Sequence, residues 1–288
     1  MGIDIYLIQA LHGLVYGMLI FMVASGLTLV FGMMGILNLA HASFYMLGAY
    51  FAYTVTVYLG NFWLSLIISP LIVGILGILT ERFLLRPVHI KGHIAELLLT
   101  FGLFYVLGEA VRIIWGSNPL PVPVPGILKG DIPFFEMTYP IYRLFILCFS
   151  VFILVGMLIL LMKTRIGILI RAATSDTDMV DALGTNVPVL FMGVFGGGAA
   201  LAAVAGVVAA PFLSVFPGMG LDVLLDCFVV IVIGGFGSMF GAFVAALMIG
   251  ELQSFGVLWI PRFAMVFQFM LMAIVLIIRP TGLFGEVE

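Results

Sequence analysis

Nine apolar stretches follow one another along this 288-residue chain. They cover residues 5–31, 43–60, 63–85, 94–116, 139–162, 188–213, 223–236, 238–258 and 263–278. A helix needs about 20 predominantly apolar residues to cross a bilayer, and most of these stretches are that long. Charged residues make up only 9% of the chain, against roughly 25% in soluble domains, so water could not solvate such a surface. The sequence therefore predicts an integral membrane protein.

The fold class expected from these stretches is an all-α polytopic membrane protein with about eight or nine transmembrane helices. Helices satisfy every backbone hydrogen bond inside a bilayer, and the stretches lack the alternation that is typical of a membrane β-barrel. The stretch at 223–236 is too short to cross alone, which predicts a broken or re-entrant helix there. We expect residues 1–288 to form a single transmembrane domain.

Lysine and arginine residues indicate the orientation, because cytoplasmic loops carry an excess of them. Arg82, Arg86 and Lys91 fall in one loop, Lys163, Arg165 and Arg171 in a second, and Arg279 follows the last stretch. We place these three regions in the cytoplasm. The proline-rich loop at 117–138 is then extracytoplasmic, and its prolines favour extended backbone over helix. If all nine stretches cross, the N-terminus lies outside and the C-terminus inside.

Two segments, 193–206 and 234–241, are dense in glycine and alanine. Small residues four apart let helix backbones approach closely in lipid, where packing drives association. These segments therefore predict tight helix packing, which is also compatible with helices that slide or tilt against each other.

The segment 38–50 places Asn38, His41 and Ser43 among apolar residues. A polar side chain in hydrocarbon costs free energy unless it finds a partner or water, so these groups are expected to face other helices or a cavity. One interpretation is that Asn38 and His41 lock an irregular turn by bonding to backbone freed by Gly32 and Gly35. The alternatives are that they line a translocation path or belong to a proton relay.

Acidic residues near the stretches are few. Glu109 and Arg112 stand three apart on one predicted helix, where they can pair and offset the cost of desolvation. Other acids near or in the stretches include Glu96, Asp222, Asp226 and Glu251, and they are scattered. A segment with two of them, 218–228, can be aligned, with gaps, to 32–44. Paired broken helices at matching places are typical of transporters built by duplication.

The stretch 163–187 predicts a short helix between two spans on the cytoplasmic side. Ser175 or Asp176 can cap its start, and Gly184 can end it in the left-handed conformation. Acidic residues in its early turns, where the helix dipole favours them, are Asp178 and Asp181. Such a helix makes a compact docking knob; the alternative is an ordinary ordered loop.

Several classes of function find no support in the sequence. It has no GxSxG, HExxH or P-loop pattern, and Ser238 has no nearby base, so no catalytic residue is assigned. Cys148 and Cys227 lack metal-ligand spacing, and no metal site is expected. No basic patch indicates nucleic-acid binding.

Five segments, spread over nearly the whole chain, form a series that matches one family. They are LTLVFGMMGILNLAHASFYMLGAY (27–50), ERFLLRPV (81–88), TRIGILIRAATSDTDMVDALGTNV (164–187), VIGGFGSMFGAFVAALMIGELQS (232–254) and RPTGLFG (279–285). In this order they resemble the branched-chain amino-acid ABC-transporter permeases, and the LivH type more closely than its LivM sister. Two features depart from the family. An alanine follows His41 where glycine is common, and the sequence of the outer proline-rich loop is particular to this chain.

The resemblance implies a non-enzymatic permease subunit of an ATP-driven ABC importer in the bacterial inner membrane. The solute would be a branched-chain or other hydrophobic amino acid, or a related small molecule. The implied partners are a second, LivM-like permease subunit, two ABC ATPase subunits and a periplasmic solute-binding protein. The implied fold is similar to that of vitamin B12-type importer permeases. Because the chain has no nucleotide-binding motif, ATP and Mg²⁺ would be bound by the partner ATPases, and this chain would need no cofactor.

The resemblance also places the family's coupling helix at 175–187. The candidate ATPase-coupling residues are Asp176, Asp178, Met179, Asp181, Ala182, Leu183 and Gly184. The candidate path or gate residues are Asn38, His41, Ser43, Asp222 and Asp226. Met179 and Val180 replace alanines that are typical of importer permeases. The alternative functions are an ion-coupled secondary transporter or channel, which needs a buried cluster of acids, and an intramembrane enzyme, which needs a nucleophile beside a base.

Overall fold

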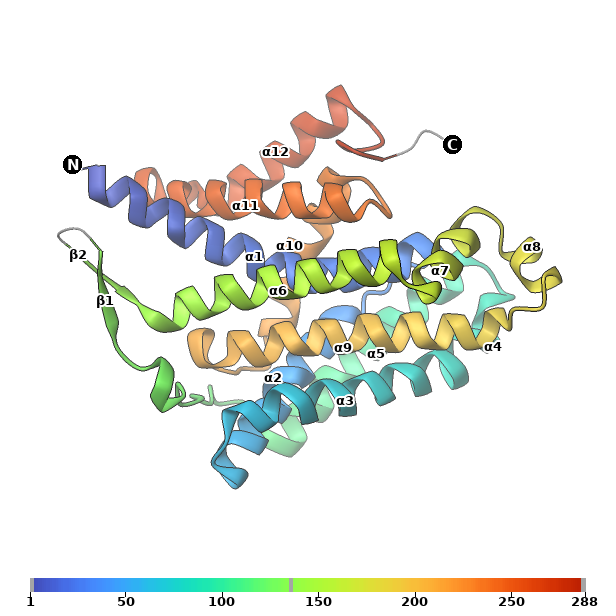
Figure 1. Cartoon of the computed structure of the whole chain (residues 1–288), viewed down its shortest axis with the longest axis horizontal. Coiled ribbons are helices and arrows are strands. Elements are labelled where there is room, and N and C mark those ends of the chain that lie inside the picture. Colours follow the sequence, from blue (N-terminus) through green and yellow to red (C-terminus); the bar gives the residue numbers. More distant parts are fainter. Residues whose placement is uncertain (1–2, 135–136, 286–288) are drawn as a thin grey trace.

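The computed structural model describes residues 3–134 and 137–285, and helices make up most of it (Figure 1). The long helices are α1 (Ile3–Met34), α2 (His41–Leu59), α3 (Phe62–Thr80), α5 (His93–Trp115), α6 (Ile141–Lys163), α9 (Val187–Leu213), α10 (Met219–Gly234), α11 (Met239–Trp259) and α12 (Ala264–Ile278). The short elements are η1 (Glu81–Leu85), α4 (Arg86–His89), η2 (Gly126–Leu128), β1 (Asp131–Phe134), β2 (Met137–Pro140), α7 (Arg165–Ser175), α8 (Thr177–Ala182) and η3 (Pro261–Phe263).

Each of the nine apolar stretches corresponds to one of the long helices. Within the described residues, seven of these helices are long and apolar enough to span a membrane, counting η1 and α4 with α3 and η3 with α12. The other two are α2, which has 19 residues but is less apolar, and α10, which has only 16. The prediction of an all-α polytopic membrane protein is confirmed, and the stretch at 223–236 is a short helix as expected.

The two ends of the molecule carry different elements (Figure 1). The start of α1 and the strands β1 and β2 lie at one end of the long axis. The elements α4, α7 and α8 and the segment that follows α12 lie at the other. The three regions rich in lysine and arginine therefore share one end, as expected, and the proline-rich loop lies at the opposite end. The distribution of positive charge predicts that the end with α8 is cytoplasmic.

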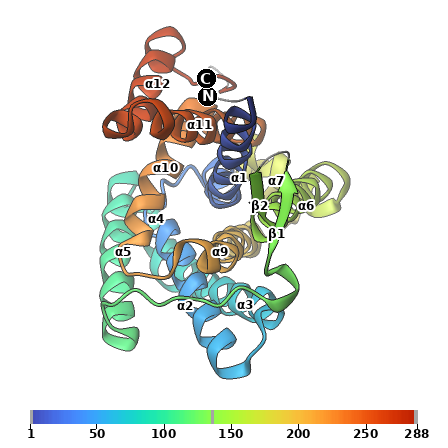
Figure 2. The same cartoon turned by 90° about the vertical axis from the view of Figure 1, so that its left-hand side faces the viewer.

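Four helices form the inside of the bundle. Figure 2 looks along the long axis and shows α1, α2, α9 and α10 surrounded by α3, α5, α6, α11 and α12. Most residues of α1 and α2 are buried, whereas α5, α6 and α12 bury few of theirs and expose apolar side chains. The outer helices therefore face lipid or other subunits, and the inner helices provide the core, in which Phe21, Phe44 and Phe195 are fully buried.

Small residues set the spacing of the inner helices. A methyl group added at Gly198 on α9 would lie 2.9 Å from the carbonyl oxygen of Gly26 on α1. One added at Gly77 on α3 would lie 2.7 Å from the Cβ of Ala199. The expected tight packing of the first glycine-rich segment is confirmed at Gly196, Gly198 and Gly206, whereas Gly193 and Gly197 have open space around them. Close backbone contact of this kind drives association in lipid.

The proline-rich loop at 117–138 leads into the one sheet found among the described residues. No helix forms from Gly116 to Pro125, and Pro125 has φ −54° and ψ 140°, in agreement with the expected extended backbone. Strands β1 and β2 then pair antiparallel, with Ile132 opposite Tyr139, and β2 leads directly into α6. The sequence analysis did not predict this hairpin, and it placed the start of α6 two residues too early.

Candidate functional site

The break between α1 and α2 lies inside the bundle. After Met34 the chain leaves α1, and α2 begins at His41 without a side-chain cap. The imidazole of His41 nevertheless lies beside Val23 and Gly26, at least eight residues before the end of α1. At 1.5 Å per residue, the chain has therefore turned back by about 12 Å before α2 starts. This re-entrant start places polar groups well away from either end of the bundle.

His41 is held by α1 rather than by the turn that precedes it. Its Nε2 lies 3.0 Å from the carbonyl oxygen of Val23 and donates to it, and its Nδ1 is buried with no partner among the described residues. A methyl group at Gly26 would lie 3.0 Å from Cε1 of His41, so glycine at that position leaves room for the ring. The expectation that His41 bonds to backbone freed by Gly32 and Gly35 is wrong, because the ring reaches past the turn to the middle of α1.

Asn38 and Ser43 occupy different surroundings. Asn38 is 1% exposed, and neither its Oδ1 nor its Nδ2 has a hydrogen-bond partner in the part of the chain that the structure describes. The expected bond from Asn38 to the glycine backbone is therefore not formed. Ser43 faces α5, where its hydroxyl lies 3.4 Å from the carbonyl oxygen of Phe104. Buried amide groups are usually hydrogen-bonded. The side-chain amide of Asn38 therefore has a free donor and a free acceptor with which it can bind a further polar group.

Asp226 is the centre of a polar network on α10. Tyr16 on α1 donates to its Oδ2 over 2.7 Å, and Gln268 on α12 donates to its Oδ1 over 3.2 Å. Asp222, one turn earlier on α10, is exposed. The sequence analysis named both aspartates but not Tyr16 or Gln268. Gln268 could have been noticed as the polar residue within an apolar helix, whereas Tyr16 has no local signal.

The structure brings the starts of α2 and α10 together. A methyl group at Gly220, in the first turn of α10, would lie 3.3 Å from the carbonyl oxygen of Ala42 and 3.6 Å from the Cβ of Met46. The two segments that the sequence analysis aligned, 32–44 and 218–228, are therefore neighbours. The side chain of Asp226 nevertheless bonds to α1 and α12 rather than to α2.

Helix α8 forms between α7 and α9, as the sequence predicts. Asp176 is its N-cap, and its Oδ1 accepts from the amide of Met179 over 2.9 Å. Gly184 follows the helix with φ +88°, a conformation that favours glycine. Val180 is buried against the bundle, whereas the seven candidate coupling residues are exposed. These exposed residues are Asp176, Asp178, Met179, Asp181, Ala182, Leu183 and Gly184.

Ion pairs occur at both ends of the bundle. The expected pair on α5 is confirmed, with Arg112 Nη1 at 2.7 Å from Glu109 Oε1, and both side chains are more than half exposed. A second pair was not predicted: Arg86 on α4 lies 3.0 Å from the buried carboxylate of Glu81, and the same guanidinium donates to the carbonyl oxygen of Pro188 over 2.8 Å. Pro188 is in the first turn of α9, directly after the α8 segment. Arg86 therefore ties the α3–α4 region to the point where α8 joins the bundle.

Comparison with known proteins identifies related sequences over almost the full chain. The family described as "Branched-chain amino acid transport system / permease component" matches residues 9–276. The high-affinity branched-chain amino acid transport system permease protein BraD of Pseudomonas aeruginosa is 30% identical, over 98% of this chain and 97% of its own length. The corresponding LivH proteins of Salmonella typhimurium and Escherichia coli are 28% and 27% identical, each over 98% of this chain and 96% of their own length. No solved structure matches the chain, so similarity to the vitamin B12-type importer fold stays a prediction.

Proposed function

This chain belongs to the permease-component family of branched-chain amino acid transport systems, and we propose that it is one of two membrane subunits of an ATP-driven importer. A second, LivM-like permease subunit would complete the translocation path. Two ABC ATPases would bind ATP and Mg²⁺ at the cytoplasmic face, and a periplasmic binding protein would deliver the solute. The solute class that the relatives' names support is a branched-chain amino acid. The membrane would be the bacterial inner membrane.

The observation that carries this proposal is the knob formed by α8. It projects at the cytoplasmic end (Figure 1) and exposes Met179 by 56% and Leu183 by 78%. Large apolar side chains exposed outside the membrane-spanning segments fit a protein interface better than water. An ATPase groove at this end would receive them, with the acidic residues of the first turn at the rim.

The connection from α8 to the interior is short. Asn186 caps α9, which starts at Val187, and Arg86 binds the carbonyl of Pro188. Helix α9 then packs along α1, α2 and α3 through small residues, so a displacement of its first turn is transmitted to those helices as a rigid movement. The interior break with Asn38 and His41 lies along this route. We therefore retain Asn38, His41, Asp222 and Asp226 as path or gate residues, with Ser43 at the contact to α5.

The test is reconstitution of the permease with and without its genetic neighbours. Proteoliposomes that contain both permease subunits, the ATPases and the binding protein should accumulate radiolabelled leucine when ATP is supplied on the ATPase side. Omission of the ATPases, or an ATPase variant that cannot hydrolyse ATP, should abolish accumulation. Uptake that persists without ATPases and follows an ion gradient would instead establish a secondary transporter.

A further inference from the structure

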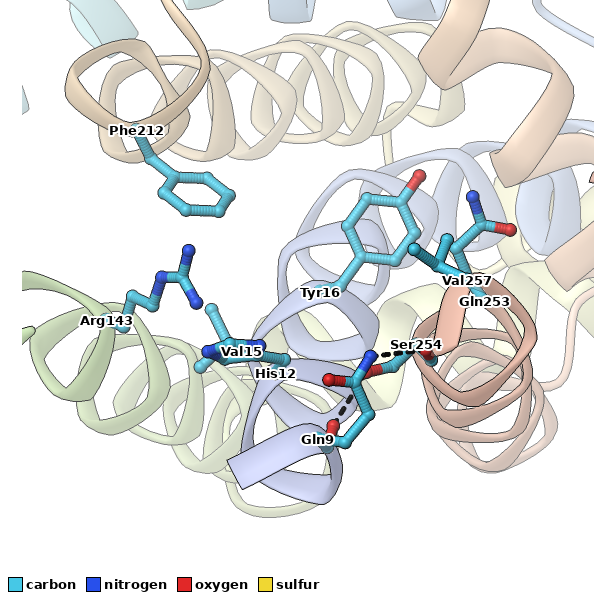
Figure 3. A pocket seen from close by; sticks show the side chains of 9 residues that line it. All are labelled: Gln9, His12, Val15, Tyr16, Arg143, Phe212, Gln253, Ser254 and Val257. Atoms are coloured by element: carbon cyan, nitrogen blue, oxygen red, sulfur yellow. Dashed lines mark hydrogen bonds between the residues drawn. The ribbon is translucent and has the colours of Figure 1, made fainter. Parts of the chain in front are cut away.

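A cavity of about 230 Å³ opens among α1, α6, α9 and α11 near the extracytoplasmic end (Figure 3). Its lining residues are Gln9, His12, Val15, Tyr16, Arg143, Phe212, Gln253, Ser254 and Val257. Pockets for drug-sized ligands measure roughly 300–1,000 Å³, so this cavity suits a smaller solute. None of the residues in this lining is acidic.

Arg143 gives the cavity its positive charge. Its Cζ lies 5.0 Å from the centroid of the Phe212 ring, which holds the guanidinium in place by a cation–π contact. No carboxylate among the described residues pairs with Arg143, and the group beside it is the neutral hydroxyl of Tyr139. A guanidinium offers paired N–H donors in the geometry that a carboxylate accepts. The described part of the lining thus presents an anion-binding group without a competing acid.

The rest of the lining is largely apolar or already engaged. Val15, Phe212 and Val257 contribute apolar surface, which can cover an aliphatic side chain. The Oε1 of Gln253 is buried without a partner in the described part of the chain, but its amide lies beyond Tyr16 from Arg143 (Figure 3). Gln9 donates to the carbonyl oxygen of Ser254. The groups near Arg143 therefore fit the carboxylate and the aliphatic side chain of an apolar amino acid.

We propose that this cavity is an extracytoplasmic binding site for a free aliphatic α-amino acid, in which Arg143 binds the carboxylate and the apolar lining covers the side chain. The identity of the solute rests on the proposed function. The site lies within one subunit and precedes the interior break. Tyr16 lines the cavity and also bonds to Asp226, so an amino acid bound here touches the network that holds α10.

The direct test is protection of a cysteine placed in the cavity wall. Val257→Cys in the assembled complex would be labelled with a membrane-impermeant thiol reagent, and the labelling of Cys148 and Cys227 in the parent protein would be subtracted. Millimolar leucine should slow the labelling of Val257→Cys severalfold. Isoamylamine, which has the same aliphatic chain but no carboxylate, should not. A cysteine at Ile114, at the outer end of α5 and outside the lining, should be labelled at the same rate with or without leucine.

Substitution of the arginine completes the test. Arg143→Gln should remove the protection by leucine and lower uptake by roughly tenfold or more, because a charge-assisted bond to the carboxylate is lost. Arg143→Lys should keep part of the protection by leucine and part of the uptake. The matched control is Arg262→Gln, which removes an exposed arginine of η3 outside the cavity and should leave protection and uptake within about twofold.

The outcomes separate this inference from the proposed function. Equal protection by leucine and isoamylamine, or no protection while unmodified complex transports leucine normally, would overturn the cavity assignment and leave the importer intact. Protection by glycerol 3-phosphate but not by leucine would show a lipid-phosphate site and would also overturn it. Absence of amino-acid uptake by the unmodified complex would count against the proposed function, whereas the labelling assay still reports on the cavity.

Discussion

The hydroxyl of Tyr16 on α1 lies 2.7 Å from a carboxylate oxygen of Asp226 on α10, although the two residues are 210 positions apart in sequence. With Gln268 bonded to the other oxygen, three helices meet at one buried carboxylate. The start of α10 lies beside the start of α2. The network therefore fixes one side of the interior break, and the outer cavity ends at the same tyrosine.

Tyr16→Phe should lower the free energy of unfolding by about 1–3 kcal/mol, because Asp226 stays buried with one donor fewer. Tyr53→Phe is the control, since the Tyr53 hydroxyl has no hydrogen-bond partner among the described residues. The double variant Tyr16→Phe/Asp226→Leu lacks the carboxylate that needs the donor. Its loss of unfolding free energy should therefore be smaller than the sum of the losses in the two single variants. Unfolding in mixed detergent micelles is measured for the parent protein, the single variants Tyr16→Phe, Asp226→Leu and Tyr53→Phe, and the double variant. Strictly additive values would mean that the hydrogen bond contributes nothing.

Gly26→Ala should destabilise the protein by about 1–3 kcal/mol, through overpacking of the core. The added methyl group would lie 2.6 Å from the carbonyl oxygen of Gly198 and 3.0 Å from the ring of His41. Gly102→Ala on α5 has open space around it and should be neutral or slightly stabilising, since alanine favours helix. Thermal unfolding of the solubilised proteins compares the two. Equal melting temperatures for the two variants would contradict the close contact of α1 with α9.

Gly184→Pro should abolish co-purification of the ATPases with a tagged permease. Gly184 has φ +88°, and proline fixes φ near −65°, so the chain after α8 must take another course. Gly184→Asn is the matched control, because asparagine tolerates the left-handed region, and it should retain most of the association. Deletion of 176–184 should have the same effect as the proline. Normal recovery of the ATPases with both the proline variant and the deletion would refute the coupling role of α8.

Arg86→Met should reduce solute transported per ATP hydrolysed severalfold, because the bond from α4 to the first turn of α9 is lost. The variant should also lose about 1–2 kcal/mol of stability, a modest amount because the Arg86 side chain is 38% exposed. Arg82→Met, in the same region, is the control: its guanidinium lies over the Phe83 ring and does not reach α9. Uptake and ATPase activity are measured on the same proteoliposomes. An equal proportional fall of the uptake and ATPase rates leaves their ratio unchanged, and that result would argue against a relay through Arg86.

The sequence was informative wherever local chemistry decides the structure. The bilayer requires long apolar helices, so nine stretches predict nine helices, and Asp176 and Gly184 mark the two ends of α8 because capping is local. The partners of the polar groups were not predictable in this way. His41 reaches Val23 only because the chain turns back between α1 and α2, and the depth of that turn is set by packing against α9. Asp226 has one partner 210 residues away and another 42 residues away.

The outer cavity illustrates the same limit. Its lining comes from four helices that no sequence pattern connects, and no sequence motif singles out Arg143. Its importance follows from what surrounds it: an aromatic ring, no acid in the lining, and open volume. The hairpin of β1 and β2 was missed because two four-residue strands are too short to show a clear alternation.

The burial of α2 against α9 also bears on how the protein is made. The last residue of α2 is Leu59 and the first of α9 is Val187, so the ribosome adds 128 residues between them. At about 5–20 residues per second, roughly 6–25 seconds pass before α2 can meet the helix that covers it. During this interval α9 does not yet cover α2, the helix that carries His41 and Ser43. The nascent chain must therefore shelter this helix within the insertion machinery or at the membrane surface until the second half arrives.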